Sequence, residues 1–145
     1  MKAKSTVSDL AARLRTLMDF QPIDPSQTYT IGELASHLRV SLRTLRFYEQ
    51  AGLLQPDREG LRRLYSPQDL ERLEVIVALR ELEVSLTSIK ALLATADGAA
   101  SSEKADQMLD GILEDLARAN RDRIAELEGI NRRIDVAREG VPQAL

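Results

Sequence analysis

The end of the 145-residue chain carries an apolar repeat that limits the folds open to it. Residues 103–138 are expected to form one long helix, because apolar side chains recur there at alternating steps close to three and four. At about 1.5 Å per residue, this helix would be roughly 50 Å long. The rest of the domain is too small to bury so long and narrow a stripe, so we expect a partner helix to cover it. The residues of this seam are Leu109, Leu113, Leu116, Asn120, Leu127, Ile130 and Ile134.

Two polar residues, Asn120 and Arg123, interrupt the seam. They mark either the point where two antiparallel helices cross or a seam that lies one helix face away from the one assigned here. In both interpretations the helix over 103–138 is the predicted dimerisation element.

Composition restricts the chemistry that the chain can perform. It has no cysteine and one histidine, His37, which excludes disulfides, thiolate metal sites and a histidine metal cluster. We find no spaced carboxylate pair, nucleophile triad or glycine-rich phosphate loop, so we expect neither an enzyme nor a bound cofactor. The longest uncharged apolar run, residues 75–79, is far too short to span a bilayer, and the first residues lack a signal peptide's apolar core. A soluble, cytoplasmic protein is therefore expected.

Two short helices are predicted to follow each other across a very tight turn. Thr30 and Glu33 fit a capping box, in which the threonine side chain and the glutamate side chain each accept a hydrogen bond from a backbone amide at the start of a helix. Ser41 is the next helix-capping candidate, and only residues 39–40 separate the two helices. Helices joined in this way form a helix-turn-helix.

The signals that follow predict a β-hairpin and two more helices. Gly52 is suited to end the second helix in a left-handed conformation, and Pro56 lies in a turn-rich stretch before the strand-like residues 61–65. We interpret this stretch as a wing. Ser66 then caps a third helix and Ser85 a fourth. The fold class is therefore mainly α, with a winged helix-turn-helix domain followed by a long C-terminal helix.

The net charge of −3 argues against nucleic acid as a partner, but the charges are unevenly distributed. Residues 28–65 hold six basic and four acidic side chains, a net charge of +2. In a helix-turn-helix the second helix enters the major groove, where Arg43 in its first turn can hold a guanine and Arg46 can pair with a phosphate. The alternative is that both arginines pair with Glu49 or Glu33 on the protein surface.

Aromatic side chains gather in the same region. We expect the ring of Tyr48 to pack inward and its hydroxyl to reach a phosphate oxygen. Phe47 has no hydroxyl and is assigned to the core, between helix and wing. Arg62, Arg63 and Tyr65 on the wing are expected to reach neighbouring phosphates.

These motifs occur together in one order: Y-T-I-G-E-L-A, V-S-x-R-T-L-R-F-Y-E, x-G-L-L-x-P, R-R-L-Y-S and S-P-x-D-L. From residue 29 to residue 93 the sequence resembles the DNA-binding domain of MerR-family transcription regulators. The resemblance implies a winged helix-turn-helix, dimerised by an antiparallel coiled coil, that binds a pseudo-palindromic promoter element in double-stranded DNA. Many members of this family activate transcription by distorting an overlong promoter spacer, which leaves RNA polymerase open as a further partner.

The family's contacts can be carried over by position. They fall on Ser41, Arg43, Thr44 and Arg46 in the major groove, on Tyr48 at a phosphate, on Arg62 and Arg63 in the wing, and on Tyr29 or Thr30 at the first helix. Two features depart from the family pattern. Residues 38–39 are Leu-Arg where a glycine is usual in the turn, and Leu61 replaces a wing tyrosine. A left-handed residue with a side chain in that turn would cost roughly 1 kcal/mol or more. The family's metal and redox sensing needs cysteines that the chain lacks.

The predicted organisation is an N-terminal extension (1–27), the winged helix-turn-helix domain (28–96), a linker (97–102), the dimerisation helix (103–138) and a tail (139–145). The extension holds a short amphipathic helix over 8–20, outside the family core. This helix extends the dimer interface, receives a partner protein, or docks on the third and fourth helices. The predicted function is a homodimeric, sequence-specific transcriptional regulator. The alternative is a protein-interaction module, similar to small MerR-like chaperone modulators.

Overall fold

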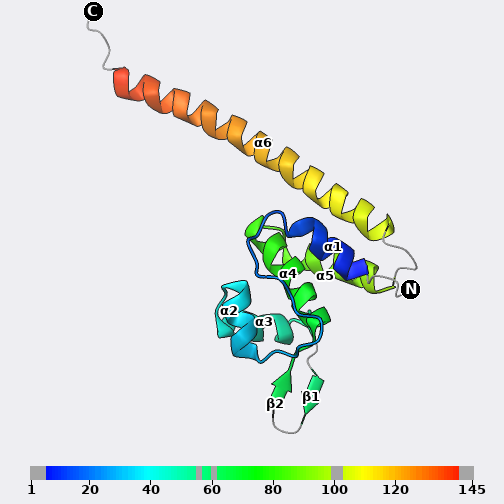
Figure 1. Cartoon of the computed structure of the whole chain (residues 1–145). Coiled ribbons are helices and arrows are strands. Elements are labelled where there is room, and N and C mark those ends of the chain that lie inside the picture. Colours follow the sequence, from blue (N-terminus) through cyan, green and yellow to red (C-terminus); the bar gives the residue numbers. More distant parts are fainter. Residues whose placement is uncertain (1–5, 55–56, 60–61, 99–102, 141–145) are drawn as a thin grey trace, which may run out of the picture. The chain divides into compact units, whose positions relative to one another are not determined.

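The computed structural model in Figure 1 describes residues 6–54, 57–59, 62–98 and 103–140, without the side chains of 57–59 and 62–63. Its elements are α1 (Thr6–Leu14), α2 (Ile31–Leu38), α3 (Leu42–Gln50), β1 (Asp57–Glu59), β2 (Arg62–Leu64), α4 (Pro67–Glu81), α5 (Leu86–Gly98) and α6 (Glu103–Glu139). The chain forms two compact units, residues 1–109 and 110–145. The predicted fold class, a mainly α winged helix-turn-helix followed by a long C-terminal helix, is confirmed.

Serine and threonine caps begin the helices where the sequence predicted them. Thr30 and Glu33 form a capping box at α2, and Ser66 and Asp69 form another at α4. Ser41 has an extended backbone, and its side chain accepts a hydrogen bond from the amide of the residue at the third position of α3. These caps fix where the two helices of the helix-turn-helix begin.

The turn between α2 and α3 is built on a left-handed arginine. Arg39 has φ 56° and ψ 43°, a conformation that is strained for a residue with a side chain. This is the conformation for which the missing glycine would have been suited. Gly52 after α3, with φ 79°, takes the same conformation as predicted, and Glu83 after α4 takes it with φ 67°.

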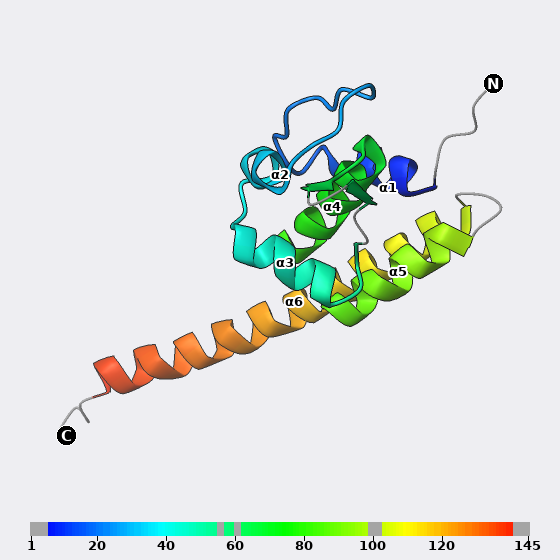
Figure 2. The same cartoon turned by 90° about the horizontal axis from the view of Figure 1, so that it is seen from below.

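Helix α4 forms the centre of the first unit. It packs against α1, α2 and α5, and Figure 2 shows it between α3 and α1. Every residue from 73 to 79 is buried, on all sides of the helix. Partners cover α4 from several directions, which explains why its burial is not limited to one stripe.

The wing is a two-stranded antiparallel hairpin. In its register, Asp57 lies opposite Leu64 and Glu59 opposite Arg62. At the base of the hairpin, next to the end of β2, Tyr29 and Tyr65 form an isolated antiparallel bridge. In this bridge each backbone amide donates to the carbonyl of the other residue at 2.8 Å. The start of the helix-turn-helix is therefore tied to the base of the wing.

The N-terminal helix is shorter than the predicted 8–20. α1 ends at Leu14, and Leu17 and Met18 follow in turns whose amides donate to carbonyls three residues back. Leu17, which lies inside the range predicted to be an amphipathic helix, is 52% exposed. The helix packs on α4 and α5, which is the docking arrangement among the three expected for this segment.

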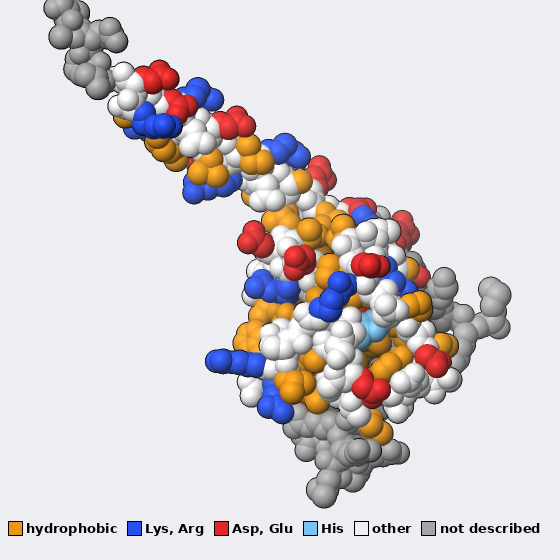
Figure 3. Space-filling view, turned by 60° about the vertical axis from the view of Figure 1, so that its left-hand side comes forward, with side chains coloured by type: hydrophobic (Ala, Val, Ile, Leu, Met, Phe, Trp, Pro, Cys, Tyr) orange, Lys and Arg blue, Asp and Glu red, His pale blue; other side chains and the backbone are white. Residues whose placement is uncertain are grey.

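Helix α6 is one unbroken element of 37 residues, as the seam predicted. Its first turns belong to the compact unit, where Ala105 and Leu109 are fully buried. Leu109 was predicted to lie on the dimerisation seam and instead packs within its own unit. Further along, Leu127, Ile130 and Ile134 are 42–48% exposed, and Figure 3 shows hydrophobic side chains as a stripe flanked by charged ones.

The remaining seam residues differ in exposure. Leu113 and Leu116 are half-buried, and Asn120 is exposed.

Among the helices of the described residues, none has the length and apolar character needed to cross a membrane.

Candidate nucleic-acid interface

The first turn of α3 presents short polar side chains and one long cation. The Ser41 hydroxyl oxygen accepts from the Thr44 amide at 3.1 Å and lies 2.9 Å from the Thr44 hydroxyl. Both hydroxyls are therefore held near the helix start. Arg43 is exposed beside them, as a residue that reads base edges must be.

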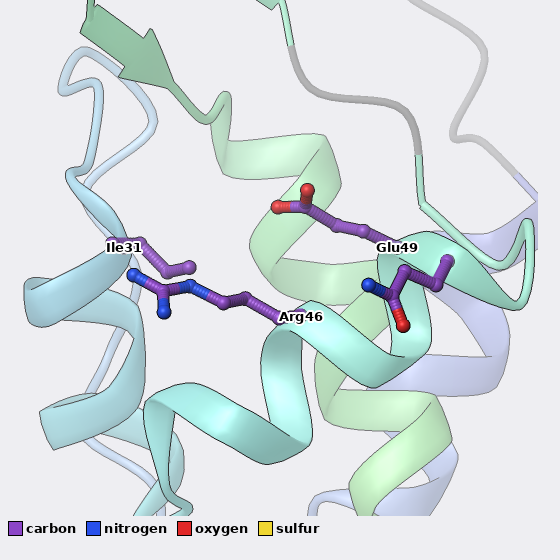
Figure 4. A pocket seen from close by; sticks show the side chains of 4 residues that line it. Ile31, Arg46 and Glu49 are labelled. Atoms are coloured by element: carbon purple, nitrogen blue, oxygen red, sulfur yellow. The ribbon is translucent and has the colours of Figure 1, made fainter.

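Arg46 occupies a hollow between the two helices of the motif. The hollow is lined by Ile31 of α2 and by Arg46, Glu49 and Gln50 of α3. Figure 4 shows the Arg46 side chain reaching from α3 toward Ile31 of α2, while the Glu49 side chain extends from the same helix in front of α4. The Tyr65 hydroxyl donates a hydrogen bond to the Glu49 carboxylate. This arrangement keeps a negative charge on the same side of α3 as the Arg46 guanidinium.

The two adjacent aromatic residues of α3 lie in opposite environments. Tyr48 is 5% exposed, whereas Phe47 is 50% exposed, with 6.1 Å between their ring centroids. The assignment of Phe47 to the core was wrong. In a helix the buried Leu45 and Tyr48 share one face, and position 47 points about 100° away from Tyr48. Phe47 is thus an exposed ring on the face that carries the arginines.

Tyr48 reaches a second hollow on this face. The hollow is lined by Arg43, Thr44, Phe47 and Tyr48 of α3, by Arg80 of α4 and by Leu86 of α5. Burial raises the pKa of the Tyr48 phenol above its usual value, and the nearby Arg80 opposes that effect more weakly. The hydroxyl therefore stays protonated at neutral pH and can donate to an anion. Arg80 was not predicted as a site residue, because its place beside α3 depends on tertiary packing.

Three other predicted contact residues have structural roles. The Tyr29 hydroxyl accepts from the Asp24 amide at 3.1 Å and lies 3.3 Å from the Asp24 carbonyl, and the ring is 8% exposed. The Thr30 hydroxyl caps α2. Tyr65 is 1% exposed and bonded to Glu49. The prediction that Tyr65 reaches phosphates conflicts with this burial, because the bridge to Tyr29 turns the ring into the core.

The wing arginines were predicted to complete the interface. Arg62 and Arg63 belong to β2, and Arg63 lies opposite Arg58 in the hairpin register. Their side chains lie outside the described part of the chain.

The residues of this interface lie within a segment that is similar to known proteins. Residues 29–96 match the family described as MerR HTH family regulatory protein. The chain is 34% identical over 112 residues to the HTH-type transcriptional regulator ZntR homolog of Haemophilus influenzae, covering 75% of this chain and 80% of that protein. It is 36% identical over 106 residues to the HTH-type transcriptional regulator ZntR of Escherichia coli, covering 72% and 74%.

A solved structure extends the likeness. It is HiNmlR, a MerR family regulator lacking the sensor domain, bound to promoter DNA. It matches with a TM-score of 0.53 and 29% identity over 75% of this chain and 80% of that chain. The matched family segment begins at residue 29, so α1 lies before it. Together with the capped helix-turn-helix and its wing, these likenesses show that the chain belongs to the MerR family of DNA-binding transcriptional regulators.

Proposed function

We propose that this regulator binds a pseudo-palindromic promoter site as a homodimer and distorts the DNA on binding. The observation that carries the proposal is the exposed face of α3, where Arg43, Arg46 and Phe47 stand together at the surface. A relative of similar length binds promoter DNA, which supports the same mode for this chain.

On this face, Arg43 is the base-reading residue. Its position in the first turn of α3 suits a pair of hydrogen bonds to guanine O6 and N7. Ser41 and Thr44 flank it and offer hydroxyls to neighbouring bases or phosphates. Arg46, one turn further along the exposed face of α3, pairs with a phosphate.

The aromatic residues divide into contacting and positioning roles. Tyr48 donates its hydroxyl to a phosphate oxygen, and the exposed Phe47 ring covers a sugar of the same backbone. Tyr29 and Tyr65 hold the wing base against the helix-turn-helix. Thr30 fixes the start of α2, whose first amides can also face a phosphate. Arg62 and Arg63 complete the contacts from the wing.

The exposed seam of α6 is the proposed dimer interface. Leu127, Ile130 and Ile134 are large apolar side chains on one face of a helix that carries charged residues elsewhere. A second copy of α6 offers the matching stripe, and an antiparallel pair would bring two recognition helices to the two half-sites. RNA polymerase, at a promoter in the cytoplasm, is the further partner of such a complex, and we expect no enzymatic activity.

The competing function, a protein-interaction module, is not favoured, because the relatives matched along most of the chain are transcriptional regulators. Selection of binding sites from random double-stranded DNA tests the proposal. We expect a two-fold symmetric consensus bound by two protomers, with half-site centres one helical turn or a multiple apart. Failure to enrich any sequence, or an asymmetric site bound by one protomer, would contradict it.

A further inference from the structure

A short segment that precedes the family domain contacts the helix-turn-helix. Residues 15–20 follow α1, which itself packs on α4 and α5. Three residues of this segment, Arg15, Asp19 and Phe20, contact groups in α2, its turn or α4, and we call them the N-terminal clasp. Its contacts converge on the part of the motif that sets the direction of α3.

The first contact is made through a buried carboxylate. Glu74 of α4 is 2% exposed, and its Oε1 accepts from Arg15 Nε at 3.0 Å and from Arg15 Nη2 at 2.9 Å. Its other oxygen lies 3.0 Å from Nε2 of His37 on α2. Glu74 therefore joins three parts of the chain, and Arg15 supplies the cation that a buried carboxylate needs.

The second contact is made by a ring. Phe20 stacks on the His37 ring with centroids 5.6 Å apart, and the Arg39 guanidinium lies 6.0 Å from the Phe20 centroid. Arg39 Nη2 also donates to the Asp19 carbonyl at 2.5 Å. Arg39 is the left-handed residue of the turn, so the clasp holds the strained residue that separates α2 from α3.

We propose that Arg15 and Phe20 are positioning residues for DNA recognition, which act through His37, Glu74 and Arg39 to fix the orientation of α3. The proposal rests on the proposed sequence-specific DNA binding. Bidentate base contacts need hydrogen-bond distances and angles within narrow limits, whereas attraction to phosphates tolerates small shifts. Loosening the clasp should thus reduce the preference for the cognate site more than the affinity for unrelated DNA.

The chain supplies a matched pair for the test. Arg13 and Arg15 have the same type of side chain, both 39% exposed, and Arg13 pairs with Asp106 of α6 at 3.8 Å. Cognate and scrambled DNA would be titrated by fluorescence anisotropy at a temperature where each full-length variant is folded by circular dichroism. Arg15→Ala should lower the ratio of cognate to scrambled affinity by about tenfold, the size of losing one base contact. Arg13→Ala removes the same charge and should leave the ratio unchanged.

A second pair of variants, both at Phe20, changes no charge and tests the same proposal if Arg15→Ala does not fold. Phe20→Ala should lower the affinity ratio, and Phe20→Tyr, which keeps the ring over His37, should restore it. Unchanged ratios in the Arg15 and Phe20 variants, with a discriminating wild type, would overturn the positioning role. A wild type without any preference for selected DNA would instead overturn the proposed function, so the two failures are distinguishable.

Discussion

Arg15 and Glu74 are 59 residues apart in the chain, yet Arg15 Nη2 lies 2.9 Å from Glu74 Oε1. One partner precedes the family domain, and the other lies in its central helix. The pair therefore links the N-terminal segment to the DNA-binding unit through a carboxylate that is almost fully shielded from water.

This pair predicts a difference in stability between neighbouring arginines. Arg15→Ala should lower the free energy of unfolding by about 1–3 kcal/mol, because it leaves a buried acceptor without its donors. Arg13→Ala, at an ion pair of half-exposed side chains, should change it by less than about 0.5 kcal/mol. Urea denaturation followed by circular dichroism measures both. Equal losses of stability in the two variants would contradict the claim that the Arg15–Glu74 pair stabilises the fold more than the Arg13–Asp106 pair.

The two aromatic neighbours of α3 give a second prediction. Tyr48→Ala should cost about 3–5 kcal/mol of folding free energy, since it empties a buried site. Phe47→Ala should cost less than about 1 kcal/mol, since half of that ring already faces solvent. Thermal unfolding of the two variants side by side would reveal the order. The reverse order would mean that Phe47 is the core residue.

The contrast between these residues shows what the sequence could predict. The caps at Thr30, Ser41 and Ser66 were predicted because a cap depends on residues within one turn. The inward position of the Tyr48 ring was also predicted correctly, and the three-residue spacing of Leu45 and Tyr48 places Phe47 off their shared face. The core assignment of Phe47 relied on its lack of a hydroxyl and overlooked this spacing.

Long-range polar contacts were equally hidden. Glu74 stands at the start of the apolar run 75–79, and nothing near it in the sequence indicates that Arg15 and His37 will contact its carboxylate. Tyr65 was assigned to DNA because wings carry phosphate contacts, while its bridge to Tyr29 draws the ring inward. The end of α1 was misplaced because Leu17 continues the apolar spacing after the helix has stopped.

Two left-handed residues provide a third prediction. Glu83 and Arg39 have φ 67° and 56°, where a glycine avoids roughly 1 kcal/mol of strain. Glu83→Gly should therefore raise the free energy of unfolding by a few tenths to about 1 kcal/mol. The gain is reduced because a glycine also makes the unfolded chain more flexible, which favours the unfolded state.

Arg39→Gly should bring no such gain. Relief of the same strain is offset by loss of the bond to the Asp19 carbonyl and of the contact with Phe20. Chemical denaturation of both variants is the measurement. A larger gain for Arg39→Gly than for Glu83→Gly would show that the clasp contributes nothing at this turn.

The seam of α6 yields a fourth prediction. Ile130→Asp should shift the protein from dimer to monomer in sedimentation equilibrium, because a charge would be buried against the partner's stripe. Val136→Asp is the matched control, since Val136 is 69% exposed and lies away from the seam on the same helix. Dissociation by Val136→Asp with an intact Ile130→Asp dimer would place the interface on the other face.

The central claim, that the α3 face and wing read a specific DNA sequence, is tested most directly by anisotropy titration of the selected site. Wild type would be compared with Arg43→Ala and with the Arg43→Ala/Arg63→Ala double variant, on selected and scrambled DNA at several salt concentrations. We predict that Arg43→Ala loses about 1–3 kcal/mol of preference for the selected site, and that the double variant also shows a shallower salt dependence. Affinity that is unchanged in the double variant would contradict the account.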